Sequence, residues 1–130
     1  MPVPKSHADI LDKQAFASVA TIGPDGEPQN NPVWFGWDGS KIRFSQTRAR
    51  QKYRNVHADR RVALSILDPD DPYRYLEVRG VVVDVEDDHD LAFINSMALK
   101  YLCLDRYPWH QPGDERVVIV VEPTHATTMG

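Results

Sequence analysis

The chain has 130 residues, of which 42% are hydrophobic and 26% are charged, so it is long and apolar enough for one globular domain over residues 1–130. Its formal net charge of −4 argues against general affinity for nucleic acid. No apolar run approaches the ~18 residues of a membrane-spanning helix, the N-terminus has no apolar signal region, and the single cysteine, Cys103, excludes an intrachain disulfide framework. We therefore expect a cytoplasmic protein that does not enter a membrane.

The first half of the chain predicts a short helix followed by strands and a second helix. Ser6–Asp9 has the form of a capping box, which predicts an N-terminal helix. Alternating patterns and intervening turn residues predict strands at Ala15–Ile22, Gln29–Trp37 and Lys41–Ser45. Thr47 then has the position of an N-cap for a helix whose apolar face holds Ala49, Tyr53 and Val56.

The second half begins with two strand patterns, of which the second carries an irregularity. Arg61–Leu67 alternates, and Tyr73–Glu86 follows after an acidic, proline-containing loop. In the longer strand the apolar residues occupy even positions before Gly80 and odd positions after it. Such a change of parity at a glycine predicts a bulge or sharp coil there, as in the bent strands of small barrels.

The last third predicts a helix, a loop and a buried strand. Asp88 has the position of an N-cap for a helix that ends near Leu102. The loop after this helix contains Trp109-His110, and these side chains are expected either to line a pocket or to fill the inside of the loop as a structural plug. Arg116–Glu122 is apolar on both faces, so we expect cover on both sides, with a partner subunit as one candidate. Pro123 is expected to break this strand, with a last short strand reaching Thr128.

These elements together predict a mainly β fold. Six or seven strands joined by short connections are mostly antiparallel, and two or three helices would pack outside them. The sequence contains no internal repeat or linker that would divide the chain. We therefore expect a small antiparallel barrel with flanking helices.

The basic residues of the chain are concentrated in the segment Lys41–Ala58. This segment contains six Lys or Arg residues and no acid, which leaves 9 basic against 19 acidic residues elsewhere, a net charge of −10. Cations near a helix N-terminus oppose the helix dipole, so their presence suggests a bound anion. The groups that could hold a phosphate are Ser45, Thr47, Arg50 and Lys52. The alternative is an ordinary solvated basic surface.

The usual signatures of autonomous catalysis and of metal binding are absent from the sequence. It has no glycine-rich dinucleotide fingerprint, no phosphate-binding Walker loop, no nucleophile elbow, and no histidine or cysteine spacing typical of a metal site. We therefore predict no metal and name no catalytic residue. If the protein is an enzyme, a bound cofactor carries the chemistry.

The order of the motifs resembles the flavin/deazaflavin oxidoreductase superfamily, which shares the split β-barrel of pyridoxamine 5'-phosphate oxidase. The resemblance runs from about Ile10 to Pro123. Its motifs are Ala17-Ser18-Val19-Ala20-Thr21, Gly23–Pro28, Asn31-Pro32-Val33-Trp34-Phe35, Phe44–Asn55, Arg61–Leu64, Glu77–Gly80 and Lys100-Tyr101. It implies an FMN-binding split β-barrel that forms a homodimer, with the cofactor across the subunit interface.

The resemblance also implies roles for individual residues. Arg50 and Lys52, with Ser45 and Thr47 beside them, would hold the cofactor phosphate. The strand that contains Pro32, Val33 and Trp34 would back the ring system, and Tyr73 and Tyr75 would contact it from the second subunit. Arg48 and Arg54 would suit the acidic oligoglutamate tail that a deazaflavin cofactor carries.

The spacing Arg50-Gln51-Lys52 resembles the branch that binds the deazaflavin coenzyme F420, as found in actinobacteria. The FMN oxidase branch more often has an adjacent Arg-Lys pair, and Thr124–Gly130 leaves no room for the pyridoxal-phosphate-binding segment of the true oxidase. The resemblance therefore implies an F420H2-dependent reductase that transfers hydride to a small conjugated or electrophilic molecule. The alternatives are an FMN-dependent oxidase or reductase and a non-catalytic cofactor-binding protein.

Overall fold

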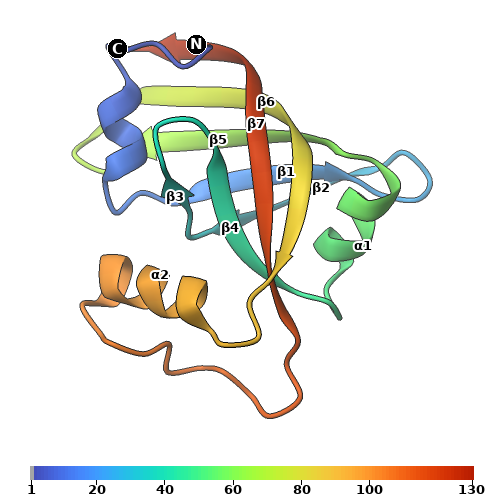
Figure 1. The fold of residues 1–130 in the computed structure, drawn as a ribbon. Coiled ribbons are helices and arrows are strands. Elements are labelled where there is room, and N and C mark those ends of the chain that lie inside the picture. The colour runs from blue at the N-terminus through green and yellow to red at the C-terminus, as the bar shows by residue number, and fades with distance from the viewer. Residues whose placement is uncertain (1) are drawn as a thin grey trace.

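Seven antiparallel strands form one sheet with the strand order β2-β1-β5-β6-β7-β4-β3 (Figure 1). The computed structural model describes residues 2–130, so Met1 of the predicted 1–130 domain lies outside the described residues. In chain order the strands are β1 (Ala17–Ile22), β2 (Pro28–Val33), β3 (Gly36–Trp37), β4 (Ile42–Thr47), β5 (Arg61–Asp68), β6 (Asp71–Asp87) and β7 (Arg116–Met129). Two α-helices and one 3₁₀-helix complete the fold, which confirms the predicted mainly β architecture.

The two edge strands of the sheet, β2 and β3, are consecutive in the chain. Only Trp34 and Phe35 separate them, where the sequence had predicted a single strand over Gln29–Trp37. Because two residues span a few ångströms, the sheet must bend back until its edges meet. This meeting of the edges makes the barrel, and it places Asn31–Trp34 near β4.

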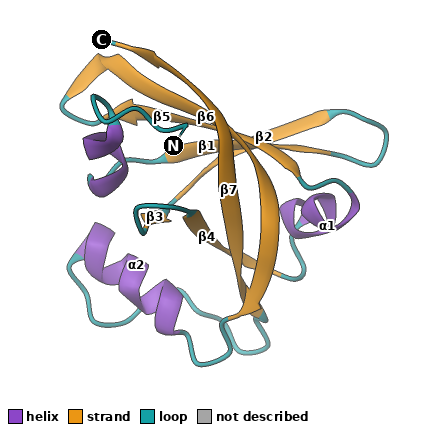
Figure 2. Cartoon of the chain, turned by 45° about the horizontal axis from the view of Figure 1, so that its top comes forward, coloured by secondary structure: helices purple, strands orange, loops and turns teal. Residues whose placement is uncertain are grey.

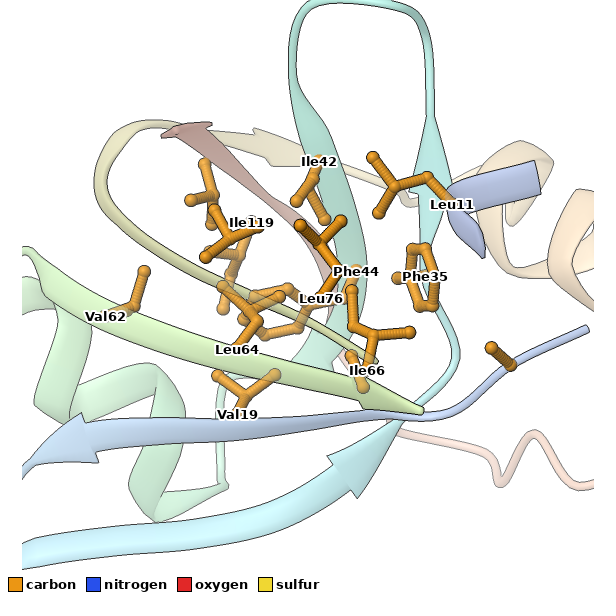
Figure 3. Packing of buried hydrophobic residues seen from close by; sticks show 14 of the residues in the cluster. Leu11, Val19, Phe35, Ile42, Phe44, Val62, Leu64, Ile66, Leu76 and Ile119 are labelled. Carbon is orange, nitrogen blue, oxygen red and sulfur yellow. The ribbon is translucent and has the colours of Figure 1, made fainter. Parts of the chain in front are cut away.

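The interior of the barrel holds one apolar cluster drawn from nearly every strand (Figure 3). Alternate residues of β5 point inward, as period two requires, and Phe44 and Phe35 fill the space between the two edges. The largest side chains in this cluster are fully buried: Phe35, Phe44, Ile10, Leu11, Ile42, Leu64, Ile66, Leu76 and Ile119. This dry core fixes the strands that carry the polar groups described below.

Strand β6 has a register shift at Gly80, as predicted, but the change of parity comes three residues later, at Val83. Val82 is still buried like the even positions before it, and Val83 is the residue that the pairing with β7 skips, so the parity changes there. A second shift at Arg79/Gly80 skips Thr124 of β7. Gly80 is needed for close approach, because a Cβ atom there would lie 2.6 Å from the carbonyl oxygen of Glu122. Val81 consequently points outward.

Strand β7 runs through Pro123 to Met129, so the predicted break at the proline is wrong. Pro123 lies beside the skipped residue, at a bulge where a missing N–H costs no ladder hydrogen bond. Val118 and Val120 on the outer face are only 4% and 2% exposed in one chain. The cover predicted for both faces of this strand is therefore supplied within the chain.

The helices begin later than the sequence predicted. Helix α1 spans Gln51–Ala58 with Arg50 at the N-cap, because Thr47 still pairs with Arg116 as the last residue of β4. Helix α2 spans Ala92–Leu102 with Leu91 at the N-cap. The Asp88 carboxylate nevertheless accepts the amide protons of Phe93 and Ile94 at 2.9 and 3.0 Å. It caps the helix from outside, across a turn that the pattern did not reveal.

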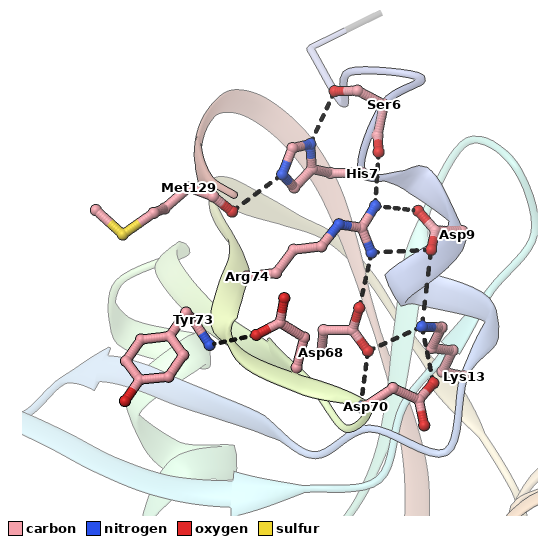
Figure 4. A network of polar contacts seen from close by, with 10 residues as sticks. Ser6, His7, Asp9, Lys13, Asp68, Asp70, Tyr73, Arg74 and Met129 are labelled. Atoms are coloured by element: carbon pink, nitrogen blue, oxygen red, sulfur yellow. Dashed lines mark hydrogen bonds and ion pairs between the residues drawn. The ribbon is translucent and has the colours of Figure 1, made fainter.

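The N-terminal helix is the 3₁₀-helix η1 (Ala8–Asp12), and the predicted capping box does not form. Ser6 Oγ instead bonds His7 Nδ1 at 2.8 Å. The Asp9 carboxylate binds the guanidinium of Arg74, which also holds Asp68 (Figure 4). These contacts tie η1 to the β5–β6 hairpin.

Figure 2 shows α2 and the long loop after it lying below β3 and β4, on the opposite side of the barrel from the chain termini. Lys100 of α2 donates to the carbonyl oxygen of Phe35 at 2.8 Å. Helix α2 is therefore fixed directly to the linker between the edge strands. Within residues 2–130, no helix has the length and apolar character required to cross a membrane.

Candidate functional site

A cavity of about 300 Å³ lies where the two edges of the barrel meet. One wall comes from the end of β2 and the linker after it, and the facing wall comes from β4. Helix α2, the loop after it and the start of β7 close the remaining side. The lining residues are Phe16, Asn31, Pro32, Val33, Trp34, Ser45, Gln46, Thr47, Arg50, Ile94, Tyr107, Trp109 and Arg116.

Most of the residues predicted for the phosphate and ring system meet at this cavity. Those that line it are Pro32, Val33, Trp34, Ser45, Thr47 and Arg50. They come from three separate segments, which the return of the sheet brings together. The chain therefore has a concave polar and aromatic site at the place that sequence analysis proposed for the cofactor.

Arg50 supplies an available positive charge at one end of the cavity. Its backbone amide donates to the carbonyl oxygen of Thr47 at 3.1 Å, which shapes the turn between β4 and α1. Its exposed guanidinium has no hydrogen-bond or ion-pair partner among the described residues 2–130. The first turn of α1 contains no acidic residue. The free cation and the helix N-terminus together favour an anion.

Lys52 lies behind this cavity rather than in its lining. It is only 2% exposed, and its Nζ donates to Oδ1 of Asn31, which does line the cavity. Burial, with a smaller contribution from the charge of Arg50, lowers the pKa of Lys52 to about 8. A buried ammonium group with no carboxylate among its hydrogen bonds is costly, and a nearby anion would offset that cost.

Four other predicted residues are placed elsewhere in this chain. Arg48 donates to the Tyr53 hydroxyl at 2.6 Å and lies 3.7 Å from the Glu115 carboxylate. Arg54 donates to the carbonyl oxygen of Ala49 and to Gln51 Oε1. Two tyrosines on β6, Tyr73 and Tyr75, do not line the cavity, and Tyr73 is 81% exposed.

The aromatic wall of the cavity is held rigidly. Trp34 stacks on Tyr101 with ring centroids 5.1 Å apart and an interplanar angle of 7°. The Tyr101 hydroxyl donates to the Ala15 carbonyl oxygen at 2.6 Å and accepts the Phe35 amide proton at 3.1 Å. Burial raises the pKa of Tyr101 to about 12, so its hydroxyl remains a neutral donor. Tyr101 thereby positions Trp34 as a flat surface facing the cavity.

Several lining residues were not proposed from the sequence. Arg116 and Ile94 lie in elements whose patterns indicated burial, and Gln46 had no distinguishing signal. Sequence analysis left open whether Trp109 lines a pocket or fills its own loop, and the structure places it at the cavity with Tyr107. The only available signal was the density of aromatic residues in a loop after α2. Among residues 2–130, no three His, Cys, Asp or Glu side chains are grouped to hold a metal ion.

Comparison with known proteins identifies the family of this chain. A family profile described as pyridoxamine 5'-phosphate oxidase matches residues 3–130. The chain belongs to this family. A search of curated proteins finds no match.

Solved structures of the pyridoxamine 5'-phosphate oxidase fold include one named "F420 Reductase", which is 45% identical, with a TM-score of 0.87. It covers 96% of this chain, and this chain covers 98% of it. A conserved hypothetical protein of Mycobacterium tuberculosis has the same fold at 22% identity and a TM-score of 0.75, with 98% and 84% of the two chains covered. A family protein of Listeria innocua matches at 20% identity and a TM-score of 0.72, with 95% and 94% covered.

Proposed function

We propose that this protein is a reductase that uses coenzyme F420 to reduce a small conjugated or electrophilic molecule. The observation that carries this function is the 45% identity, over nearly the full length of both chains, to a structure named F420 reductase. At that identity and coverage the two chains share the fold over nearly their whole length. When bound in its reduced form, the deazaflavin supplies the hydride.

The residues at the cavity suit the cofactor. Arg50, the amides at the start of α1 and the hydroxyls of Ser45 and Thr47 offer donors to a phosphate, and the buried charge of Lys52 lies behind Asn31. Pro32, Val33 and Trp34 offer an apolar and aromatic wall to a flat ring. This set is complementary to a molecule with one anionic and one planar part. In such a cleft the protein contributes binding, orientation and exclusion of water.

We also propose that two copies of the chain assemble and that the cofactor lies between them. Tyr73 is exposed and Tyr75 is half-buried, and their position away from the cavity is consistent with contacts to the cofactor of the other copy. Arg48 and Arg54 would attract the acidic tail at the rim, although each is also held by groups of its own chain. The single cysteine suits a cytoplasmic location.

The test of the cofactor site is Arg50→Gln, with Arg43→Gln as the matched control. Arg43 lies on β4 and binds Asp38 at the turn, so its loss removes one charge outside the cavity. We expect Arg50→Gln to raise the Kd for F420 about tenfold or more, as for loss of one charge-assisted contact, and Arg43→Gln to leave it unchanged. Calorimetric titration measures both values.

FMN is titrated beside F420 with the same proteins, because FMN is the alternative cofactor of this family. Tighter binding of FMN than of F420 would replace the deazaflavin with the flavin in this proposal. Equal effects of the two substitutions would contradict the role of Arg50. Tight F420 binding without reduction of any electrophile in a broad panel would instead support a cofactor-binding protein without turnover.

A further inference from the structure

Arg116 is a buried cation in the cavity whose hydrogen bonds are incomplete. It opens β7 and is only 9% exposed. Its Nη1 donates to Ser45 Oγ at 3.3 Å, and the nearest carboxylate oxygen, on Asp114, lies 3.9 Å from Nη2, which is too far for a hydrogen bond. Its Nε has no partner among the described residues 2–130. At least one donor of this guanidinium therefore lacks an acceptor from the chain.

A buried guanidinium in this condition is costly unless something else satisfies it. An unpaired buried donor loses its hydration without compensation, and a charged donor loses more than a neutral one. The planar fork of arginine matches a carboxylate in geometry and in charge. An anionic oxygen that enters the cavity would therefore meet a donor that is already oriented.

The surroundings of Arg116 define the rest of the molecule that would fit. Its guanidinium lies over the Tyr107 ring, 4.5 Å from the centroid. Trp109 packs against Tyr107 at 5.6 Å and against Trp34 at 6.2 Å, and it remains 56% exposed at the rim. These rings offer flat faces for stacking next to a positive charge. A planar conjugated body with an attached carboxylate has the complementary shape and charge.

Arg116 and Arg50 line the same cavity but have different surroundings. Arg116 pairs with Thr47 across β4 and β7, and its buried guanidinium donates to Ser45 Oγ and lies over the Tyr107 ring. Arg50 is exposed at the turn into α1, three residues after Thr47. If the cofactor phosphate binds Arg50 and the amides at the start of α1, Arg116 remains available to a second anionic group beside the aromatic residues.

We propose that Arg116 binds a carboxylate of the substrate and that the aromatic residues Trp34, Tyr107 and Trp109 hold its flat conjugated part. The substrate class of the reductase is then a planar unsaturated acid. This proposal rests on the proposed function only because it assumes that the cofactor phosphate binds at Arg50. The rival role is a direct contact between Arg116 and the cofactor itself.

The test measures binding of two probes that differ only in charge, trans-cinnamate and trans-cinnamamide, by calorimetric titration. The proteins are the unchanged chain, Arg116→Gln, Arg116→Lys and the control Arg43→Gln. We expect Arg116→Gln to weaken cinnamate binding about tenfold or more and to leave cinnamamide binding unchanged. Arg116→Lys keeps the charge without the fork, so its affinity for cinnamate should lie between those two values.

F420 affinity, measured separately on the same proteins, distinguishes this proposal from the proposed function. An unchanged Kd for F420 in Arg116→Gln, together with the loss of cinnamate binding, supports the proposal. A large loss of F420 affinity with cinnamate unaffected would overturn it, as would no cinnamate binding by the unchanged chain. Because Arg116→Gln could unfold the chain, its melting temperature is measured first, and Arg116→Lys alone decides the outcome if the glutamine variant does not fold.

Discussion

At the scale of single residues, the site depends on two cations with opposite exposure: Arg50 is exposed and Lys52 is buried. Arg50 is exposed and its guanidinium has no partner among the described residues 2–130, so it is available to a ligand at little cost to folding. Lys52 is buried and held by a neutral amide oxygen, so its charge is retained against a desolvation penalty. The buried cation is the more sensitive of the two to pH, because its pKa is near 8.

We predict that F420 affinity falls as the pH rises through about 8. Below that pH Lys52 is charged in the free protein, and above it the bound anion must draw a proton onto Lys52. The Kd should then increase by up to about tenfold per pH unit until the pKa of the complex is reached. Calorimetric titration from about pH 7 to about pH 10 measures this dependence.

The variant Lys52→Met separates this effect from any titration of the cofactor. It should bind F420 weakly at every pH and lack the added dependence above pH 8. The unchanged chain should also gain stability relative to this variant as the pH rises from about 8 toward 10.5, because the pKa of Lys52 is lower in the folded state than its ordinary value. Parallel pH profiles for the two proteins would contradict the role of Lys52.

At the scale of elements, the barrel is joined to its N-terminal segment by an ionic cluster that sequence analysis did not predict (Figure 4). The buried carboxylate of Asp68 accepts from Lys13 and Arg74, each at 2.8 Å, and from the amide of Asp70 at 2.9 Å. The hydrogen bond from Lys13 is the main cause that holds the pKa of Asp68 far below its ordinary value. Removing this one carboxylate leaves two cations without their shared partner.

We predict that Asp68→Asn lowers the melting temperature and that Asp70→Asn, at a side chain 77% exposed, changes it little. The Asp68 contribution is present above its unfolded pKa near 3.8 and is lost as the pH falls through its lower folded pKa. The difference between the two proteins should therefore persist at neutral pH and narrow below about pH 4. Thermal melts at several pH values measure it, and equal melting temperatures at pH 7 would refute the role of the cluster.

Local patterns predicted the order of the elements because period-two alternation depends only on which face is buried. Arg61–Leu67 and Tyr73–Glu86 are close to β5 and β6 for that reason. The predictions fail where a residue far away in the sequence determines the local structure. Thr47 stays in a strand because β7 pairs with it, and Pro123 is accommodated because a bulge across from Gly80 removes the need for its N–H.

Sequence analysis could predict the part of the candidate site whose charged residues are concentrated in one segment of the chain. The basic cluster identified Arg50 and its neighbours because their concentration is unusual in an acidic chain. Arg116 was missed since a single cation before an apolar strand is indistinguishable from an ordinary strand end. Its significance depends on unmet hydrogen bonds and on Tyr107 beneath it, which only the three-dimensional arrangement reveals.

At the scale of the whole molecule, the outer face of β5 and β6 carries a second cavity of about 390 Å³, lined mostly by small and apolar residues. Val81 lines it and is 37% exposed, and Val83 farther along β6 is 43% exposed. An apolar strand face of this kind suits the proposed contact between two copies. Tyr73 lies near the start of the same strand and is free to reach beyond its own chain.

We predict that Val81→Asp converts the proposed dimer into a monomer and weakens F420 binding, because a cofactor that lies between two chains would lose its contacts with the second chain. Leu99→Asp is the matched control, since Leu99 is also an exposed apolar residue but lies on α2.

Tyr73→Ala should weaken F420 binding without changing the molecular mass of the assembly. Light scattering after size-exclusion chromatography gives the mass, and titration gives the Kd. An unchanged chain that is monomeric and binds F420 as tightly as Val81→Asp would show that one barrel is sufficient for the site.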